Sequence, residues 1–576
     1  MAPLGRRLHR LASRPWLPYL MLLLLQAKVM WYGLGSRDLV LADEAQYYNA
    51  AYLWFQHFRL DPVWYPLYTA YLGTLLNVST DAYVVTVLHR VLVVLALDVL
   101  VLALMRRLLP NWIAWLVAAW WVILPTNFDA LFTIHLFAAI PVLASWLLIL
   151  YRPRPWARGG ALAIMLLATA LTRNEYLVGA LTLGAVCLWW ELRMAGRLEP
   201  PAGRWSYAVG YGLPILLAAL AIAGVAARSI YRPPELWAEA RSKHVRNLCM
   251  TYAFGYQQRH PEWTKSPWLD CSDLMEQRFG APLPTLTGMI RGNPRALLEH
   301  FRWNAGLTPT GIQVLLFNVS SARVDPGYGD IRRRPVRANR LSALVAGIAT
   351  IGLFLIWRER RYWWERWLAT RALGWLAMLS MIPVAVVVIL TQRPRPAYLF
   401  AQGLFLMALT GMCAFAIVRR WDPPQRLLSA GLPLVMIALL VLVPGGPYIH
   451  RDPRSLLALY RRLAPFQDAF TQPGTIFLLP GYLLEIQGYV AHEYLKDPFS
   501  NRDYRILDSR PAGLPLGEFL DRQGVNLFYV DEALWARLEA DPATAPFLDT
   551  PDASGWEVLV RHRSEGGTWM LLRRRA

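Results

Sequence analysis

Apolar residues recur along the chain in blocks long enough to cross a bilayer. A transmembrane helix needs about 20 predominantly apolar residues. Eleven segments match this pattern: 15–36, 82–105, 109–124, 130–150, 159–171, 176–191, 206–227, 338–357, 372–391, 398–418 and 427–444. The pattern therefore predicts an α-helical polytopic membrane protein with about eleven transmembrane helices.

The polar segments between and after these blocks predict four regions. An N-terminal membrane module, 1–227, contains a first loop at 37–81 that is semi-apolar and rich in Tyr and Trp, which is typical of helices lying along the membrane interface. A large polar loop, 228–337, precedes a second set of spans at 338–444. In that loop, Asn293 followed by Pro294 predicts a helix start.

The fourth region, 445–576, has the pattern of a small α/β domain. Helical patterns lie around Leu483 to Leu495, Leu516 to Arg522 and Glu532 to Ala540. Short strand-type runs alternate with them: Thr475 to Leu479, Tyr504 to Leu507, Asn526 to Val530, Glu557 to Val560 and Thr568 to Leu572. We expect the last two strands to form a hairpin through 565–567.

Composition and charge agree with a membrane protein and give its orientation. The 576 residues are 56% hydrophobic and 17% charged, against about 25% charged in soluble domains. The net charge of +20 would suit nucleic acid if it lay on one soluble face. Cytoplasmic loops, however, carry an excess of basic residues. With the N-terminus inside, the inner segments hold twenty arginines and the short outer segments five. The charge is thus a topology signal, and we expect no nucleic-acid partner.

This orientation places three polar regions, 37–81, 228–337 and 445–576, on the exoplasmic side. Asp43 and Glu44 lie there, shortly after the first span. One interpretation is structural, with Asp43 as a helix N-cap and Glu44 as a first-turn acid. The other is functional: a carboxylate at the membrane surface acts as a general base or helps to hold a metal.

Two further outer turns carry charges close to the hydrocarbon. Arg173 and Glu175 separate two spans by a few residues, and either pair with each other or bind a polar ligand. Arg393 and Arg395 are outer arginines in a short loop, where the distribution of basic residues disfavours them. Guanidinium groups suit phosphate, so we expect this loop to bind one.

Ionisable residues also occur within or near the spans. Arg90 and His135 lie near the outer ends of their spans, whereas Asp98 lies deeper and is expected to have a structural partner. Cys249 and Cys271 are 22 residues apart in one exoplasmic segment. They could form a disulfide or remain two free thiols, and the sequence does not decide between these states.

Taken together, these motifs resemble the GT-C superfamily of integral membrane glycosyltransferases. The run from Asp43 to Tyr48 resembles the acidic motif of that superfamily's first exoplasmic loop, and Arg90 resembles an arginine that opens the second span. The turn 172–175 reads Thr-Arg-Asn-Glu where relatives more often have Thr-Arg-Pro-Glu. The segment 393–400 is similar to an Arg-Tyr motif before a late span, with Pro396 and Ala397 inserted.

The resemblance implies an inverting enzyme that transfers a sugar from a polyprenyl- or dolichyl-phosphate donor to a hydroxyl on a glycan, lipid or protein acceptor. Catalysis would fall to Asp43 and Glu44. One acidic pair is too few ligands to infer a bound divalent metal. Phosphate binding would fall to four arginines: Arg90, Arg173, Arg393 and Arg395. The substrate pocket would be lined by His135, Glu175 and Tyr398.

Two other functions fit many of the same features. A transporter or flippase of lipid-linked saccharides would also have many spans and outer arginines, although the sequence has neither internal repeats nor paired interrupted spans. A non-catalytic scaffold of an envelope-assembly complex would use the terminal domain for binding. We expect an integral membrane location in each case.

Reporter fusions test the predicted topology. A reporter fused after Arg158 is expected in the cytoplasm and one fused after Pro447 on the exoplasmic side, because the basic loops stay inside. The measurement is the activity of a reporter that works on one side only. Equal activity from both fusions would contradict the topology. The motifs assigned to the exoplasmic side would then no longer be expected on one side of the membrane.

Overall fold

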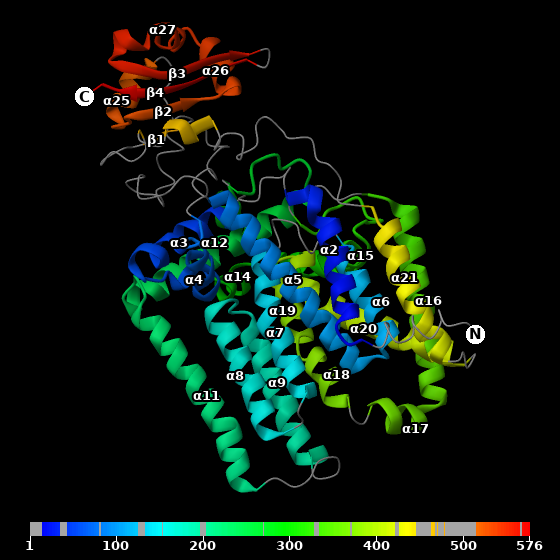
Figure 1. The fold of residues 1–576 in the computed structure, drawn as a ribbon. Coiled ribbons are helices and arrows are strands. Elements are labelled where there is room, and N and C mark those ends of the chain that lie inside the picture. The colour runs from blue at the N-terminus through cyan, green and yellow to red at the C-terminus, as the bar shows by residue number, and fades with distance from the viewer. Residues whose placement is uncertain are drawn as a thin grey trace. The chain divides into compact units, whose positions relative to one another are not determined.

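The computed structural model describes residues 14–34, 43–79, 82–124, 133–151, 154–195, 203–268, 270–327, 333–368, 371–420, 425–444, 462–466, 469, 477–478, 514–564 and 567–575. The chain divides into two compact units. The first comprises 1–35, 59–68 and 90–448, and the second comprises 36–58, 69–89 and 449–576. Helices dominate the first unit (Figure 1).

Every predicted span coincides with helix in the described residues. The helices are α2 (Leu17–Leu34), α5 (Ala82–Leu108), α6 (Asn111–Val122), α7 (Thr133–Tyr151), α8 (Pro155–Leu171), α9 (Tyr176–Trp190), α11 (Arg204–Ala227), α16 (Pro335–Arg358), α18 (Ala372–Leu379), α19 (Ile382–Thr391), α20 (Pro396–Arg419) and α21 (Gln425–Leu442). The segment 372–391 is two helices, because Pro383 begins a new helix in its first turn.

Six of these segments are long and apolar enough to cross a membrane: 84–108, 134–151, 205–227, 335–358, 372–391 and 396–419. Shorter apolar helices account for several other predicted spans. The 12-residue α6, for example, is about 18 Å long at 1.5 Å per residue, against a hydrocarbon core of about 30 Å. The apolar helices support an integral membrane protein, whereas the count of eleven crossings stays a prediction.

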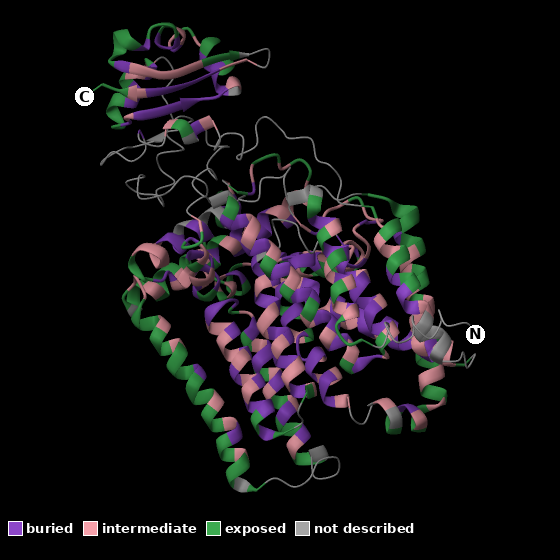
Figure 2. Cartoon of the chain, viewed as in Figure 1, coloured by how far each residue is buried: buried purple, intermediate pink, exposed green. Residues whose placement is uncertain are grey.

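The helices of the first unit differ in how much of their surface the protein covers. Helix α8 packs against α7, α9 and α11, and α7, α8 and α9 lie side by side in Figure 1. Only 11% of the apolar window of α11 and 6% of that of α16 are buried, against 50–56% for the other four segments (Figure 2). Exposed leucines on α11, such as Leu216 and Leu220, suit contact with lipid.

The large loop 228–337 is helical in the described residues. It contains α12 (Pro233–Arg259), α13 (Cys271–Phe279), α14 (Leu286–Gly292) and α15 (Pro294–Phe317). The predicted start of α15 is confirmed: the Ala296 N–H donates to Asn293 Oδ1 at 3.0 Å. A disulfide between Cys249 and Cys271 joins α12 to α13 and settles the open question about these thiols. The two helices share a buried core around Tyr252 and Met275.

The first loop also contains helices, α3 (Asp43–His57) and α4 (Pro66–Leu75), with a short 3-10 helix, η1 (Pro62–Trp64), between them. Within the second unit, the hydroxyls of Tyr48 and Thr86 are 2.6 Å apart. The helical content agrees with the amphipathic helices expected here. Their position at a membrane interface stays a prediction.

The C-terminal residues form the predicted α/β domain. Its sheet has the order β1-β2-β4-β3, from β1 (Phe477–Leu478), β2 (Leu527–Val530), β3 (Trp556–Ser564) and β4 (Gly567–Arg574). Strands β1 and β2 are parallel and the other pairs antiparallel. Helices α25 (Leu516–Arg522) and α26 (Glu532–Glu539) lie where predicted, followed by α27 (Ala545–Asp549). The predicted helix 483–495 and strand 504–507 lie outside the described residues.

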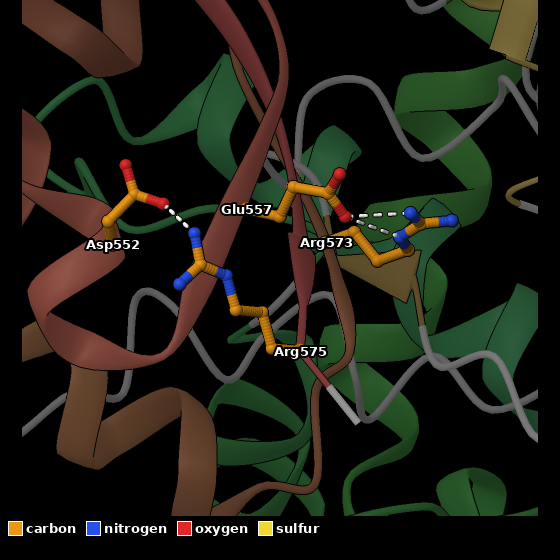
Figure 3. Close-up of polar contacts among 4 residues, drawn as sticks. All are labelled: Asp552, Glu557, Arg573 and Arg575. Atoms are coloured by element: carbon orange, nitrogen blue, oxygen red, sulfur yellow. Dashed lines mark hydrogen bonds and ion pairs between the residues drawn. The ribbon is translucent and has the colours of Figure 1, made fainter.

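The β3–β4 hairpin is confirmed by its antiparallel register, in which Ser564 faces Gly567. Glu557 and Arg573 are direct partners across the two strands, and the Arg573 guanidinium donates to Glu557 Oε2 at 2.7 and 3.1 Å (Figure 3). Asp552 pairs with Arg575 beside them. Opposite charges on facing strands favour this register over a shifted one.

Gly311 tests the packing of α15 against the loop that precedes α20. A Cβ at Gly311 would meet the carbonyl oxygen of Pro394 at 2.1 Å, whereas a Cβ at Gly306 meets nothing within 4 Å. We expect Gly311→Ala to lower stability by about 1–3 kcal/mol through overpacking. Gly306→Ala is the matched control and should be neutral or stabilising by up to about 1 kcal/mol. Thermal unfolding in detergent measures both. Equal midpoints for the two variants would contradict this packing.

Candidate functional site

The loop 59–68 of the first unit is fixed to the rest of that unit at Leu60. Leu60 N–H donates to Arg228 O and Ile230 N–H donates to Leu60 O, each at 2.9 Å. The Asp61 carboxylate caps η1 by accepting from Val63 N–H at 2.9 Å. These bonds tie the loop to the segment that begins after α11.

Lys243, on α12, contacts the same turn. Its ammonium donates to Val63 O at 2.9 Å and lies 3.3 Å from the ring centroid of Trp64 and 4.8 Å from that of Tyr65. Burial raises the pKa of Asp61, although the Val63 hydrogen bond and the Lys243 charge oppose this rise. The turn is therefore packed by a cation, a buried carboxylate and two aromatic rings.

Tyr65 has a left-handed backbone, with φ 58° and ψ 74°. Such a conformation is uncommon for a residue other than glycine, and it is kept only where the surroundings enforce it. The ring of Tyr65 lies 5.3 Å from the guanidinium carbon of Arg173. The constrained turn thus places an aromatic face against an arginine from another part of the chain.

Arg173 lies in the turn between α8 and α9, where the sequence left two interpretations open. Its guanidinium is buried, forms an ion pair with Glu175, and donates from Nε to Glu175 Oε1 at 2.6 Å. The mutual pair therefore exists. Arg173 also lies 5.3 Å from the ring of Tyr398, so it joins the Arg173–Glu175 turn to α20.

Tyr398, in the first turn of α20, is the centre of the site. Its ring lies 5.3 Å from Arg173, 5.4 Å from Arg395 and, edge to face, 4.8 Å from the ring of His135 at the start of α7. We call Tyr65, His135, Arg173, Arg395 and Tyr398 the basic–aromatic cluster. Four segments far apart in the sequence supply it.

A small cavity of about 10 Å³, roughly the room of one water molecule, lies beside this cluster. It is lined by His135, Glu175, Tyr176, Met381, Val384, Val388, Ala397, Tyr398, Phe400, Ala401 and Gln402. The three residues predicted to line a substrate pocket, His135, Glu175 and Tyr398, are thus brought together. Its wall is largely apolar with a few convergent polar groups, the chemistry of a ligand site, but the space is far smaller than the several hundred Å³ of a typical ligand pocket.

Arg393 has a different environment from Arg395. Its side chain is fully buried; Nε donates to Pro326 O at 3.1 Å, and Nη2 donates to Asp325 O at 2.6 Å and to Gln258 Oε1 at 2.9 Å. These acceptors belong to the segment 228–337. Arg393 therefore anchors the loop before α20 to that segment, and Arg395 is the arginine of this pair that lies in the cluster.

The remaining predicted residues have these positions. Arg90 is buried in α5. Asp43 and Glu44 begin α3, and their side chains lie outside the described residues. Among the residues that are described, no group of three or more potential ligands could hold a metal ion. Asp98 is buried in α5, and its carboxylate has no hydrogen-bond partner in the described part of the chain, so the expected structural partner is not found there.

Sequence reasoning did not single out Tyr65, Asp61 or Lys243. The available signal was the run Asp61-Pro62-Val63-Trp64-Tyr65, in which an Asp followed by Pro is a helix-start pattern and two aromatic residues follow. Lys243 carried no signal, because its partner turn is about 180 residues away.

No protein-family profile matches the chain, and no curated protein matches its sequence. Solved structures with some likeness include the archaeal oligosaccharyltransferase AglB from Archaeoglobus fulgidus in complex with an inhibitory peptide and a dolichol-phosphate, at 11% identity over 96% of this chain and 73% of that chain. The Archaeoglobus fulgidus oligosaccharyltransferase in the apo form matches at 14% identity over 96% and 74%. The TM-score is 0.38 for both, a distant likeness that carries no conclusion about activity.

The different environments of Arg393 and Arg395 predict different phenotypes. Arg393→Gln should destabilise the protein by about 1–3 kcal/mol, because buried acceptors lose their donors. Arg395→Gln should keep the thermal midpoint and weaken binding of a polyprenyl-phosphate by about tenfold or more. Arg395→Lys keeps the positive charge but loses the planar, two-pronged hydrogen bonding of the guanidinium. It should therefore bind more tightly than Arg395→Gln and more weakly than the wild type. Wild-type affinity in Arg395→Gln would contradict the role of this arginine.

Proposed function

We propose that the protein is an inverting membrane glycosyltransferase that moves a sugar from a polyprenyl-phosphate donor to a hydroxyl acceptor on the exoplasmic side. The observation that carries this proposal is the convergence of Arg173, Arg395, His135 and Tyr398 beside one cavity. The acidic motif at Asp43, which resembles the GT-C first-loop motif, would supply the general base.

The donor phosphate is assigned to Arg395 and Arg173. Both guanidinium groups lie over the ring of Tyr398, Arg395 is half-buried there, and Arg173 pairs with Glu175. Cations in a site of low dielectric stabilise a departing phosphate more strongly than they would in water. Arg90 is a further candidate for the same phosphate. Arg393 acts as a positioning residue, because its hydrogen bonds fix the loop that carries Arg395.

The chemical step follows from these assignments. Asp43 takes the proton of the acceptor hydroxyl while that oxygen attacks the anomeric carbon from the face opposite the phosphate. The new carbon–oxygen bond forms as the bond to the lipid phosphate breaks, through an oxocarbenium-like state, and the configuration inverts. A phosphate leaving group needs charge stabilisation rather than a proton, which suits arginines.

The remaining residues of the site have supporting roles in this proposal. His135, Glu175 and Tyr398 line the cavity and would contact the sugar or its acceptor. Glu44 would orient Asp43 or contribute one ligand to a divalent metal. The acceptor, whether glycan, lipid or protein, would reach the site from the exoplasmic side.

A donor labelled in its sugar separates the three candidate functions. Purified protein in lipid vesicles is given a radiolabelled polyprenyl-phosphate sugar and a mixture of acceptors. Label on a new acceptor supports the glycosyltransferase, and movement of intact donor between leaflets supports the flippase. Neither result, with terminal-domain binding retained, supports the scaffold.

Asp43→Asn tests the catalytic base against the helix-cap interpretation. Asn caps a helix about as well as Asp, so a purely structural Asp43 predicts near-normal transfer. A general base cannot be replaced by an amide, and its loss typically costs about 10² to 10⁴ in rate. We expect the variant to fold, bind donor and fail to transfer sugar in the labelled assay.

Glu44→Gln is the matched control for this experiment. It removes the neighbouring carboxylate and should reduce transfer less than Asp43→Asn does. Full activity in Asp43→Asn combined with inactive Glu44→Gln would move the base by one residue, whereas full activity in both variants would remove the acidic pair from the mechanism.

A further inference from the structure

Helix α16 begins with arginines on a surface that the rest of the protein leaves uncovered. Arg334 precedes the helix, and Arg337 and Arg340 lie in its first two turns; all three are exposed. Leu344 and Ile351 continue this surface and are 58% and 54% exposed. Residues three, four and seven positions apart share one face of a helix. The arginines therefore end an apolar stripe that suits contact with lipid.

Contacts with α20 show at which end of the membrane helices these arginines lie. Gly352 of α16 packs against Cys413 of α20, and each is the eighteenth residue of its helix. Near the C-terminal ends, Glu359 Oε2 lies 3.1 Å from Arg419 Nη1. The two helices therefore run parallel, and the arginines of α16 lie at the same end as Tyr398 in the first turn of α20.

The three arginines lack acidic partners in the described part of the chain. Their guanidinium groups form no ion pair or hydrogen bond with the residues described there. The sequence itself contains no Asp or Glu from Arg332 to Arg358. Charges close to hydrocarbon are costly unless something pairs with them, and the orientation expected from the basic loops disfavours arginines at this end. These positions therefore call for a negative group from outside the chain.

An open hollow, which we call the α16 hollow, lies at the start of the helix. Its volume is about 520 Å³. Three arginines and three apolar residues line it: Arg334, Pro335, Val336, Arg337, Arg340 and Leu341. The apolar part of the lining leads into the exposed stripe of α16. Such a surface suits an amphiphile that joins an anionic head to an apolar body.

We propose that the α16 hollow binds an anionic phospholipid of the surrounding leaflet, with its phosphate on the three arginines and an acyl chain along the apolar stripe. Guanidinium groups form paired hydrogen bonds with phosphate oxygens. The stripe begins within about one turn of Arg340, so the ligand meets hydrocarbon as well as charge, which favours a lipid over a free phosphate ion. A zwitterionic head group would bring its own cation against three arginines, which favours a lipid of net negative charge.

This inference goes beyond the proposed transferase activity and does not depend on it. The α16 hollow uses none of the residues assigned to the candidate site, and its readout is lipid binding rather than sugar transfer. Loss of transfer in Asp43→Asn would leave the hollow unaffected, and loss of lipid binding in the hollow would leave the assignment of Asp43 unaffected.

Lipid retention by the full-length protein tests the proposal. Phosphatidylglycerol and phosphatidylcholine with the same acyl chains are titrated in mixed micelles of a neutral detergent at constant ionic strength. Native mass spectrometry counts the bound lipids, and the thermal midpoint is a second readout, since a ligand that binds only the folded state raises it. We expect selective, saturable binding of phosphatidylglycerol and a higher midpoint.

Two results of this titration would overturn the proposal. Equal retention of the two lipids would show that the arginines contribute no selectivity for charge. A polyprenyl-phosphate that displaces phosphatidylglycerol and binds more tightly would assign the hollow to the donor lipid instead of a phospholipid.

The double variant Arg337→Gln/Arg340→Gln places the lipid on α16. An arginine close to an anionic membrane surface typically contributes about fivefold in binding, so losing two should weaken phosphatidylglycerol binding by about 25-fold. Phosphatidylcholine binding should stay the same. Both arginines are exposed, so the variant should fold as the wild type does. Undiminished phosphatidylglycerol binding in this variant would overturn the assignment.

The double variant Arg291→Gln/Arg295→Gln is the matched control. It removes the same charge from two exposed arginines of the segment 228–337. Arg295 lies about 27 Å along α15 from Gln313, whose amide donates to Ser342 Oγ of α16 at 3.2 Å. This control should bind phosphatidylglycerol as the wild type does. An equal loss in the control would show a general effect of net charge and would overturn a site at the start of α16.

Discussion

A buried guanidinium needs acceptors, and this requirement determines how the first unit is assembled. Charges close to hydrocarbon are expensive unless they are paired or hydrogen-bonded. Arg173 meets the requirement with Glu175 and two aromatic faces, and Arg393 meets it with two carbonyls and a glutamine side chain. Each arginine thereby links segments that are distant in sequence. Both links reach the start of α20: Arg173 lies over Tyr398 in its first turn, and Arg393 anchors the loop before it.

The polar segment 228–337 supports the site through contacts with its loops. Its α12 supplies Lys243 to the turn that holds Tyr65, and its later residues accept the hydrogen bonds of Arg393. The disulfide between Cys249 and Cys271 keeps α12 and α13 together. A segment that reads as a connecting loop in the sequence therefore helps to hold the candidate site in place.

The sequence predicted the helices and most of the described terminal domain, because hydrophobic period and capping residues are local signals. Asn293 caps α15 as its position before Pro294 indicated. The difference between Arg393 and Arg395 could not be predicted, since both are arginines in one short loop. Only tertiary contacts with Asp325 and Pro326 separate them. Tyr65 was missed for the same reason: its strained backbone depends on Lys243 and Asp61, which the chain brings together only on folding.

The anchoring of Arg393 also bears on how the cluster would work. A leaving phosphate gains most from cations that are already in place, since cations that must reorganise lose part of that benefit. Arg395 lies two residues after Arg393, whose side chain is fixed by three hydrogen bonds, and it precedes the first turn of α20. The backbone of Arg395 is thus held by the anchored loop, and its guanidinium lies over the ring of Tyr398. A cation held in this way, beside Tyr398 and Arg173, is preorganised for an anionic ligand.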